Sequence, residues 1–538
     1  MSNQKNQEQN QKNPDQPLIV LDKRQKFFLT IALLLGLTLI LFFNSMVKAV
    51  GSNISSDLGD ASLFGFMNTI FFLCSTSMMP VSVKIGDKYG RKPIIATGIV
   101  VYGASLLIAG LTHSMTIHLI ARGGQGLGQG CLLANSLAFL GEINTKQDRS
   151  RALGWYSVIT GVTNILGPIT GGLVTDALGW RWTCTTAMPI AVICLVLVLV
   201  FMPKVIINGE VKIDIPGAVA IAASAIGIVM FISFGQTFGG YTSPFSLGML
   251  ALFLAGLIVT LMIERKAEAP CIDLALFKQK RFTITILAII FLAPAMYATG
   301  SYIANYGQAV RGLSATVAGS FVSLNSVGLL GMGVVYTWLS VKTSIKNICL
   351  LDAALFIVNV VMMMTLGVHT ALPFIIVTVL IQGMRTSIYM PAFTTSLQND
   401  MPPEQTGIAT STAQFAQSLI GTVSVSLVST ILNNTFAKKV VTAIPEGLTE
   451  FVDPSELSGF LSSTWLMSNK AEELAAYRSS LPGDAQELFS LMIENVRTAY
   501  ASGLQAAYTV ILVCCCIGGV CCILMKIWEK KATEEKAA

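Results

Sequence analysis

Residues 84–93 read KIGDKYGRKP, a polar stretch between two apolar runs near residues 62–83 and 94–112. Each run has about 20 residues, enough to cross the hydrocarbon core of a bilayer as a helix. We interpret the polar stretch as a tight turn between two spans. In it Asp87 can face the positive end of a neighbouring helix, and Arg91 can pair with an acid or a lipid headgroup. Such contacts can latch one conformation; the plainer alternative is that they only anchor the turn.

The same alternation of apolar runs and polar turns continues along the whole chain. Of the 538 residues, 53% are hydrophobic and 12% are charged, whereas about 25% are charged in a soluble globular protein. These figures predict an all-α polytopic membrane protein, for which we count fourteen transmembrane helices. The predicted spans lie near residues 27–50, 62–83, 94–112, 116–140, 152–178, 182–202, 214–235, 246–263, 282–309, 315–339, 347–366, 371–397, 407–434 and 502–526.

Lys and Arg residues gather on alternate loops, and this asymmetry predicts the orientation of the chain. Cytoplasmic loops carry an excess of positive charge. The loops after the second, fourth and eighth spans and both chain ends are rich in Lys and Arg, while the opposite short loops hold little besides Arg181 and Arg311. Both termini are therefore predicted to be cytoplasmic, in a multi-pass protein of a bacterial-type inner membrane.

Two long segments are polar. Residues 1–25 lack the apolar stretch of a signal peptide, so we expect a disordered cytoplasmic tail. Residues 436–500 hold more acidic than basic side chains, and parts of them have helical apolar spacing. They predict a small extracytoplasmic loop with helical pieces, whose acidity could attract cations or could simply be a solvated surface.

The chain has eleven cysteines, five of them in the last predicted span. No histidine or acidic residue accompanies that group, so we interpret these cysteines as small apolar side chains in a membrane helix. We expect no bound metal and no cofactor.

A second motif, ARGGQGLGQG (Ala121–Gly130), places Arg122 inside a predicted span. A charge at mid-membrane costs at least about 2.5 kcal/mol, so Arg122 should face a polar interior and have a partner. Gln125 supplies a polar group one turn away, and the glycines allow another helix to approach closely. The alternative is a purely structural hydrogen-bonding centre.

A third motif, GVTNILGPITGG (Gly161–Gly172), combines a mid-span proline with several glycines. Proline removes a backbone hydrogen bond and kinks a helix. A kinked helix with a glycine face is suited to gating where two halves meet, although a packing kink without a gating role is the alternative. The residues concerned are Gly161, Gly167, Pro168, Gly171 and Gly172.

In this order and spacing, the three motifs resemble those of the major facilitator superfamily: its loop signature, its fourth-helix RxxQGxGxG and its fifth-helix GPxxGG, which is associated with exporters and antiporters. WRWTCTTAMP (Trp180–Pro189) and APCIDLALFKQKRF (Ala269–Phe282) resemble parts of its fourteen-helix drug:proton antiporter family, of the multidrug efflux type. The resemblance implies two six-helix bundles, two inserted helices and alternating access around a central cavity.

The resemblance also implies a domain division and residue roles. It makes Asp87, Gly90 and Arg91 a conformational latch, Arg122 and Gln125 a polar relay, and the third motif a gate, with no catalytic residues. The implied division is a tail at 1–25, an N-terminal six-helix bundle at 26–203, a two-helix insert at 204–281, a C-terminal six-helix bundle at 282–527 that contains the 436–500 loop, and a cytoplasmic tail at 528–538.

The first span departs from the family pattern. Asn44 stands where the family has an acid, and Lys48 follows one turn later on the same face. Arg385 lies within the twelfth span, and Asp352 is near a span end by our count. These residues predict an electropositive interior and anionic substrates; the alternative is that Lys48 and Arg385 snorkel to the interface. Candidate substrate-binding residues are Asn44, Lys48, Arg385, Asn305, Tyr306 and Gln382.

The sequence therefore predicts a secondary active transporter, not an enzyme, that exports small amphipathic molecules by proton antiport. With few acids in the spans, a proton could act through Asp87, through the substrate or through a lysine. Alternatives are an organic-anion uptake carrier or exchanger and, in another class, a non-transporting membrane sensor or scaffold. The expected partners are a small-molecule substrate, protons and the lipid bilayer; we expect a monomer and no nucleic acid.

Overall fold

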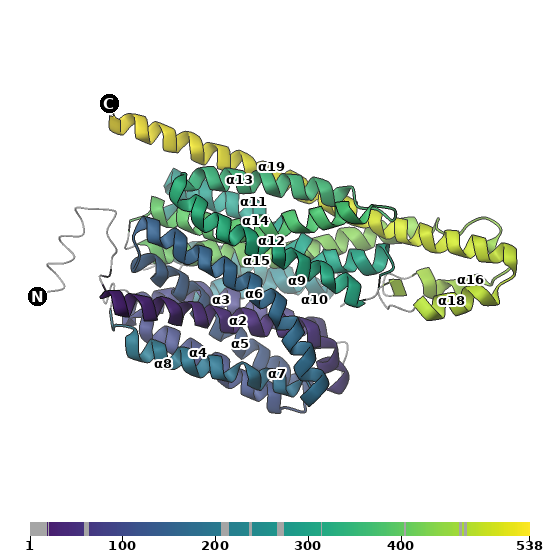
Figure 1. Ribbon diagram of the computed structural model, residues 1–538, viewed down its shortest axis with the longest axis horizontal. Helices are drawn as coiled ribbons and strands as arrows, with labels where there is room; N and C mark the ends of the chain where they lie inside the picture. Colours follow the sequence, from purple (N-terminus) through teal and green to yellow (C-terminus); the bar gives the residue numbers. More distant parts are fainter. Residues whose placement is uncertain are drawn as a thin grey trace, which may run out of the picture.

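The computed structural model is built from helices that lie side by side (Figure 1). It describes residues 19, 21–58, 64–205, 215–235, 239–265, 274–313, 315–402, 405–461, 465–466 and 471–537. Among these residues every regular element is a helix. An all-helical architecture is what a lipid-embedded chain requires, because a helix leaves no backbone polar group unpaired.

The N-terminal helices form one group, drawn in purple and blue in Figure 1. They have a common apolar core, to which α2 through α8 all contribute. The bounds are α2 Lys23–Asp57, α3 Phe64–Tyr89, α4 Arg91–Leu111, α5 Met115–Glu142, α6 Lys146–Leu178, α7 Arg181–Thr186 and α8 Met188–Phe201.

The C-terminal helices form a second group with its own, larger core. One turn of π-helix, η3, extends α11 at its end. The bounds are η2 Leu276–Lys278, α11 Lys280–Asn305, η3 Tyr306–Val310, α12 Ala315–Lys342, α13 Ile345–Met364, α14 Leu372–Asp400, α15 Thr406–Val440 and α19 Gly483–Ala537.

Two helices between the groups, α9 (Ile215–Phe234) and α10 (Pro244–Glu264), pack closely on each other. Helix α9 also contacts α3 of the first group and α15 of the second. At this contact Ile221 packs against Val81 and Phe415. The inserted pair thus covers the line where the two groups meet, while the predicted domain boundaries remain predictions.

Each of the fourteen predicted spans falls on one of these helices or, for 182–202 and 282–309, on two consecutive ones. Within the described residues, 11 helices are long and apolar enough to cross a membrane, and two shorter apolar helices lie at Ile70–Met79 and Val219–Ile232. The polytopic helical fold is confirmed, and the count of fourteen stays a prediction. Helix α5 is not among the 11, because its glycines and polar residues lower its mean hydropathy.

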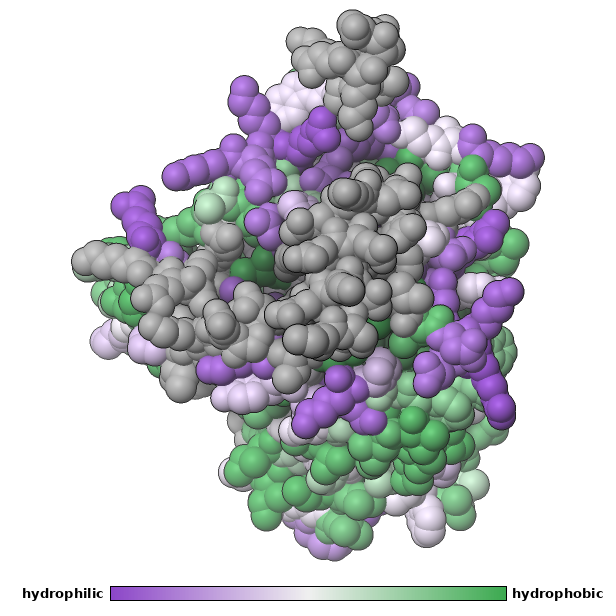
Figure 2. Space-filling view, turned by 90° about the vertical axis from the view of Figure 1, so that its left-hand side faces the viewer, coloured by the Kyte–Doolittle hydropathy of each residue, from purple (hydrophilic) through white to green (hydrophobic). Residues whose placement is uncertain are grey.

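Helix α2 begins and α19 ends at the same end of the molecule, which we call the tail end (Figure 1). Figure 2 looks onto this end and shows many hydrophilic side chains there, with hydrophobic side chains on the flank below. The sequence predicts that this end faces the cytoplasm.

The opposite end, the cap end, carries the predicted 436–500 loop. Short helices occur there, as expected, but α19 runs without a break from the cap through its predicted span. An aromatic group of Phe460, Trp465, Tyr477 and Phe489 holds the cap together, with ring centroids 4.9 to 5.3 Å apart. The cap helices are η5 Leu448–Glu450, α16 Pro454–Leu457, η6 Ser458–Leu461 and α18 Ala471–Ser480.

Candidate functional site

Arg91, the first residue of α4, is the centre of a buried ionic cluster at the tail end. Its Nη2 lies 2.9 Å from Asp87 Oδ1 and 2.5 Å from Glu142 Oε1, and its Nε lies 2.9 Å from Glu142 Oε1. Its Nη1 donates to Asn135 Oδ1 at 3.0 Å. Arg91 and Glu142 are 2% and 3% exposed. Arg91 pairs with acids rather than with a lipid headgroup, and its partners are Asp87 and Glu142. Sequence reasoning did not identify Glu142.

The turn before α4 explains why Arg91 points inward. Gly90 has φ +93°, a conformation that side chains other than glycine's rarely adopt, so the chain turns sharply there. A Cβ on Gly86 would lie 2.5 Å from Asn135 Oδ1. The two glycines therefore let α3 and the turn approach α5 closely enough for Arg91 to reach Glu142.

The cluster has titratable members outside the predicted spans. Burial raises the pKa of the Asp87 carboxyl, against the opposing attraction of Arg91 and Lys84. Burial also raises the pKa of Glu142, again against Arg91. Proton uptake by Asp87 would weaken its bond to Arg91, because that bond is charge-assisted.

The cluster also lies against the C-terminal bundle. Gly407 near the start of α15 abuts Arg91 so closely that a Cβ there would overlap the guanidinium. Arg149 at the start of α6 donates to Asn399 at the end of α14, at 3.3 Å. Further contacts between the bundles are Gln398 Nε2 to the Leu137 carbonyl at 3.4 Å and the Ser157 hydroxyl to the Ser387 carbonyl at 2.8 Å.

An apolar layer lies next to these polar contacts, between the bundles. It contains Leu37 of α2, Leu137 of α5, Leu153 and Tyr156 of α6, and Met390 of α14. These buried side chains come from both bundles, so they fill the space between the bundles at this level. A layer of this kind blocks water and polar solutes without any covalent barrier.

The glycines of the third motif face two different neighbours. A Cβ on Gly161 would lie 2.7 Å from Leu330 of α12, across the bundle interface. Gly167 and Gly171 instead lie against α2 of their own bundle, at Ser45 and Met46, and Gly172 has nothing within 4 Å. Of these glycines, then, Gly161 is the one at the interface. The Pro168 side chain lies outside the described residues.

Arg122 lies fully inside the N-terminal bundle. Its Nη1 donates to Gln125 Oε1 at 2.7 Å and its Nε to the Met67 carbonyl at 3.4 Å. The guanidinium carbon lies 4.5 Å from the Phe71 ring centroid, a favourable cation–π distance. The expected pairing of Arg122 with Gln125 is therefore present.

Arg385 lies inside the C-terminal bundle, with no exposed surface. Its Nε donates to Asn359 Oδ1 at 2.9 Å, and its Nη2 donates to the Ala295 carbonyl at 3.1 Å and to the Thr299 hydroxyl. The guanidinium carbon lies 4.3 Å from the Phe356 ring centroid. This placement differs from both sequence readings, because the group neither snorkels to the interface nor faces an open cavity.

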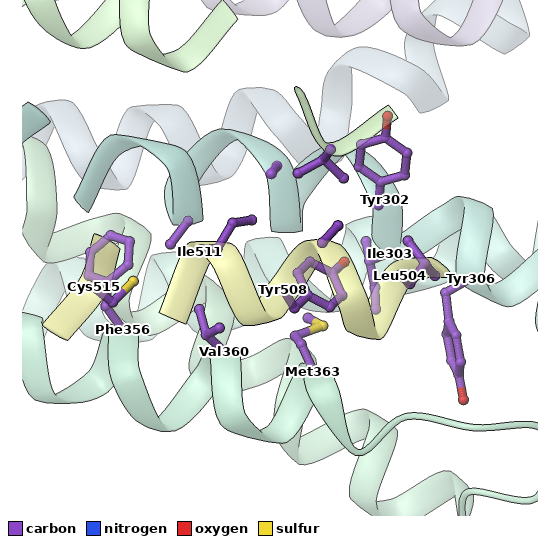
Figure 3. Close-up of a cluster of buried hydrophobic side chains, with 14 of the residues drawn as sticks. Tyr302, Ile303, Tyr306, Phe356, Val360, Met363, Leu504, Tyr508, Ile511 and Cys515 are labelled. Atoms are coloured by element: carbon purple, nitrogen blue, oxygen red, sulfur yellow. The ribbon is translucent and has the colours of Figure 1, made fainter. Parts of the chain in front are cut away.

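Asp352 is a second residue that sequence reasoning undervalued. We expected it near a span end; it is the eighth residue of α13 and is 0% exposed in the described structure. It lies on the face of α13 that carries Phe356 and Asn359, one and two turns further along. Figure 3 shows the core on that side, where Phe356, Val360 and Met363 of α13 lie near Tyr508, Ile511 and Cys515 of α19.

The other substrate-binding candidates are dispersed. Asn44 donates to Gln129 Oε1 at 3.2 Å within the N-terminal bundle. Tyr306 donates to the Gly367 carbonyl at 3.0 Å near the cap end, and Asn305 bonds to Tyr500. Gln382 is buried in α14. The structure does not gather them into one site, and the Lys48 side chain lies outside the described residues.

Comparison with known proteins agrees with this architecture. The family model described as Major Facilitator Superfamily matches residues 33–425. The multidrug transporter protein MdtP of Bacillus subtilis is 25% identical over 405 residues, covering 74% of this chain and 75% of that one. Multidrug resistance protein 3 of the same organism is 26% identical over 414 residues, covering 77% and 81%.

A solved structure, the human organic anion transporter MFSD10 (TETRAN), superposes with a TM-score of 0.55. It is 12% identical, and the match covers 91% of this chain and 100% of that one. At this identity the likeness concerns the fold alone.

Proposed function

The chain belongs to the major facilitator superfamily, and from this premise we propose that it exports small amphipathic molecules by proton antiport and alternating access. Membership makes it a multi-pass membrane transporter and not an enzyme. The names of the two Bacillus relatives support export of more than one compound. Placement in an inner membrane with both termini in the cytoplasm is part of the proposal and is supported by the loop charges.

One observation carries the alternating-access part of the proposal: the bundles are held together at the tail end by polar contacts and by a closed apolar layer. Both kinds of contact have to separate before a solute can pass at that end. Asp87 and Arg91 belong to the bundle face that would separate, since Gly407 of the opposite bundle lies against them. We therefore assign them the role of latch.

The remaining roles follow from position. Arg122 and Gln125 form a hydrogen-bonded pair in the bundle interior, suited to a polar relay. Gly161 lets α6 slide against α12 at the interface, while Gly167 and Gly171 let α6 shift on α2. Helices that meet through small residues can move past each other with little side-chain obstruction.

The anionic class of substrate is the finer part of the proposal. Asn44 in place of an acid removes the negative charge that an organic cation would need. Arg385 is enclosed by α11, α13 and α14. Of the two basic candidates, we therefore propose Lys48 as the contact for the acid headgroup of the substrate.

The test uses everted membrane vesicles that contain the full chain, with fluorescein as an anionic and ethidium as a cationic probe. We expect uptake of fluorescein when the vesicle interior is acidified, and loss of uptake when nigericin removes the pH gradient. Lys48→Ala should lower fluorescein transport, whereas the exposed Lys526→Ala serves as the matched control. Transport that ignores the pH gradient contradicts proton antiport, and preference for ethidium contradicts the anionic class.

A further inference from the structure

The C-terminal bundle contains a carboxyl group that no part of the proposed cycle has used. Asp352 is fully buried, and neither of its side-chain oxygens has a hydrogen-bond partner among the described residues. Buried polar groups in proteins are nearly always satisfied, so an orphaned carboxyl is unusual. In a membrane helix such a group usually marks an ion or proton pathway.

A charged group on a neighbouring helix is also incompletely paired. Arg385 of α14 acts electrostatically on Asp352, and its Nη1 has no hydrogen-bond partner among the described residues. Its other nitrogens are held by Asn359, Thr299 and the Ala295 carbonyl. Among the described residues, both oxygens of Asp352 and one nitrogen of Arg385 thus lack a hydrogen-bond partner.

The geometry of α13 relates the two groups. Arg385 stacks on Phe356, which is one helical turn, or about 6 Å, along α13 from Asp352. Nη1 of Arg385 is the donor left over for a bond to the carboxyl. In the arrangement seen here that bond is not made, so a charged Asp352 would lack the compensation that a buried ion requires.

We propose that Asp352 takes up and releases the coupling proton. Arg385 is the counter-charge that pairs with the Asp352 carboxylate after the proton has left. The inference rests on the proposed proton antiport and names its proton site. With its proton, Asp352 is neutral and needs no ion pair, which suits the tail-closed structure described here. When the O–H bond breaks, the proton goes to water, the carboxylate remains, and the guanidinium keeps its protons and pairs with it.

Among the titratable groups around it, Asp352 is the one that we expect to lose a proton first as the pH rises. Tyr389 of α14, Cys515 and Cys522 of α19, and Cys349 one turn earlier on α13 are near enough to interact with it electrostatically. Tyr336 of α12 interacts in the same way with Cys349, and α11 contributes the neutral groups that hold Arg385. Phenols and thiols ordinarily lose protons at higher pH than a carboxyl.

A route to the tail end is short. Lys346, in the first turn of α13, pairs with Asp400 at 3.1 Å. Asp352 lies six residues further on, about 9 Å along the helix axis. Helix α13 packs on α11, α12, α14 and α19 of its own bundle, so release on the tail-end side would follow α13 to Lys346 and Asp400 at its start.

The experiment combines a spectroscopic and a transport measurement on the full chain. Infrared difference spectra of the purified protein between acid and alkaline pH should contain the carbonyl stretch of a protonated, buried carboxyl. That band should be missing in Asp352→Asn and present in Asp484→Asn, which changes an exposed aspartate of α19. Asp87 and Glu142 are buried carboxyls too, so the two spectra are compared band by band. A spectrum of Asp352→Asn that keeps every carboxyl band of the wild type overturns the proposal.

Transport separates this inference from the proposed function. Asp352→Asn should lose fluorescein uptake driven by a pH gradient and keep exchange of fluorescein against fluorescein, since exchange moves no net proton. Gradient-driven uptake that persists in Asp352→Asn overturns the inference and leaves antiport intact. If the wild type ignores the gradient, antiport is wrong. A loss of exchange together with a lowered melting temperature would show a structural role and would also overturn the inference.

Discussion

Arg91 in the N-terminal bundle and Arg385 in the C-terminal bundle are both almost fully buried, but their partners differ. Arg91 meets two carboxyl groups and an amide oxygen within 3.0 Å. Arg385 meets only neutral oxygens, while the nearby Asp352 has no hydrogen-bond partner among the described residues. A saturated ionic cluster suits a latch that holds one arrangement. An unsaturated pair suits a group that changes its charge during the cycle.

Helix α4, which begins with Arg91, and helix α13, which carries Asp352, show the same contrast. The eighth residue of α4 is Gly98, and a Cβ there would lie 2.8 Å from Cys131 Cβ of α5. The eighth residue of α13 is Asp352. At matching depths from the tail end, one bundle has close helix contact and the other has an ionisable side chain. The two bundles therefore differ in the side chain that they bury at corresponding positions of α4 and α13.

The largest expected effect comes from removing the centre of the saturated cluster. Arg91→Ala leaves Glu142 buried without its counter-charge, which should cost about 3–5 kcal/mol of stability. We expect a strongly lowered melting temperature in detergent and little transport. The double change Arg91→Ala with Glu142→Gln should recover part of the loss. A melting temperature equal to that of the wild type would show that the cluster does not hold the bundle.

Arg385→Gln should cost less, about 1–3 kcal/mol, because the groups that it leaves unpaired are neutral. The comparison depends on this difference, and thermal unfolding of the two single variants side by side measures it. An Arg385→Gln loss as large as that of Arg91→Ala would mean that Asp352 is charged and paired in this state, which would remove the contrast.

Two glycines of one motif test the packing of α6. Gly167→Ala would push a methyl group into Ser45 of α2, so we expect reduced transport. Gly172→Ala meets nothing within 4 Å, and alanine favours a helix over glycine by about 1 kcal/mol. It should keep transport and be as stable as the wild type or more so. Equal losses in the two variants would rule out close contact with α2 as the cause.

The smallest expected effect is a pH dependence of the latch. The pKa of Asp87 is raised in the folded protein. Its contribution to stability is therefore greatest in acid and is lost as the pH rises through the raised pKa. Asn does not titrate, so from about pH 4 upward the wild type should lose stability relative to Asp87→Asn. Melting temperatures over a pH series measure this, with Asp484→Asn as control; a constant difference would contradict it.

Much of the fold followed from patterns of local composition. Apolar runs of membrane length placed the helices, and the loop charges predicted that both ends of the chain share one side. The pairs Asp87 with Arg91 and Arg122 with Gln125 were also accessible, because each lies within one helical turn or tight turn of sequence. Contacts of this range can be inferred from residues that are close together in the sequence.

Sequence reasoning missed the contacts that depend on another helix. Glu142 lies 51 positions from Arg91 and Asn359 lies 26 from Arg385, so nothing in the local sequence connects them. Position in the sequence placed Asp352 near a span end and Arg385 within a span, but it did not show that neighbouring helices enclose both side chains. Both expectations treated a helix as a cylinder in lipid, without the neighbours that decide which face is enclosed.

The sequence by itself determined that this protein crosses a membrane many times and belongs among the facilitators, because hydropathy and short motifs act over one helix or one turn. Only the tertiary structure decided which buried charges are satisfied. That property depends on how α4 and α5, or α11, α13 and α14, come together, because the partners of each buried charge come from different helices.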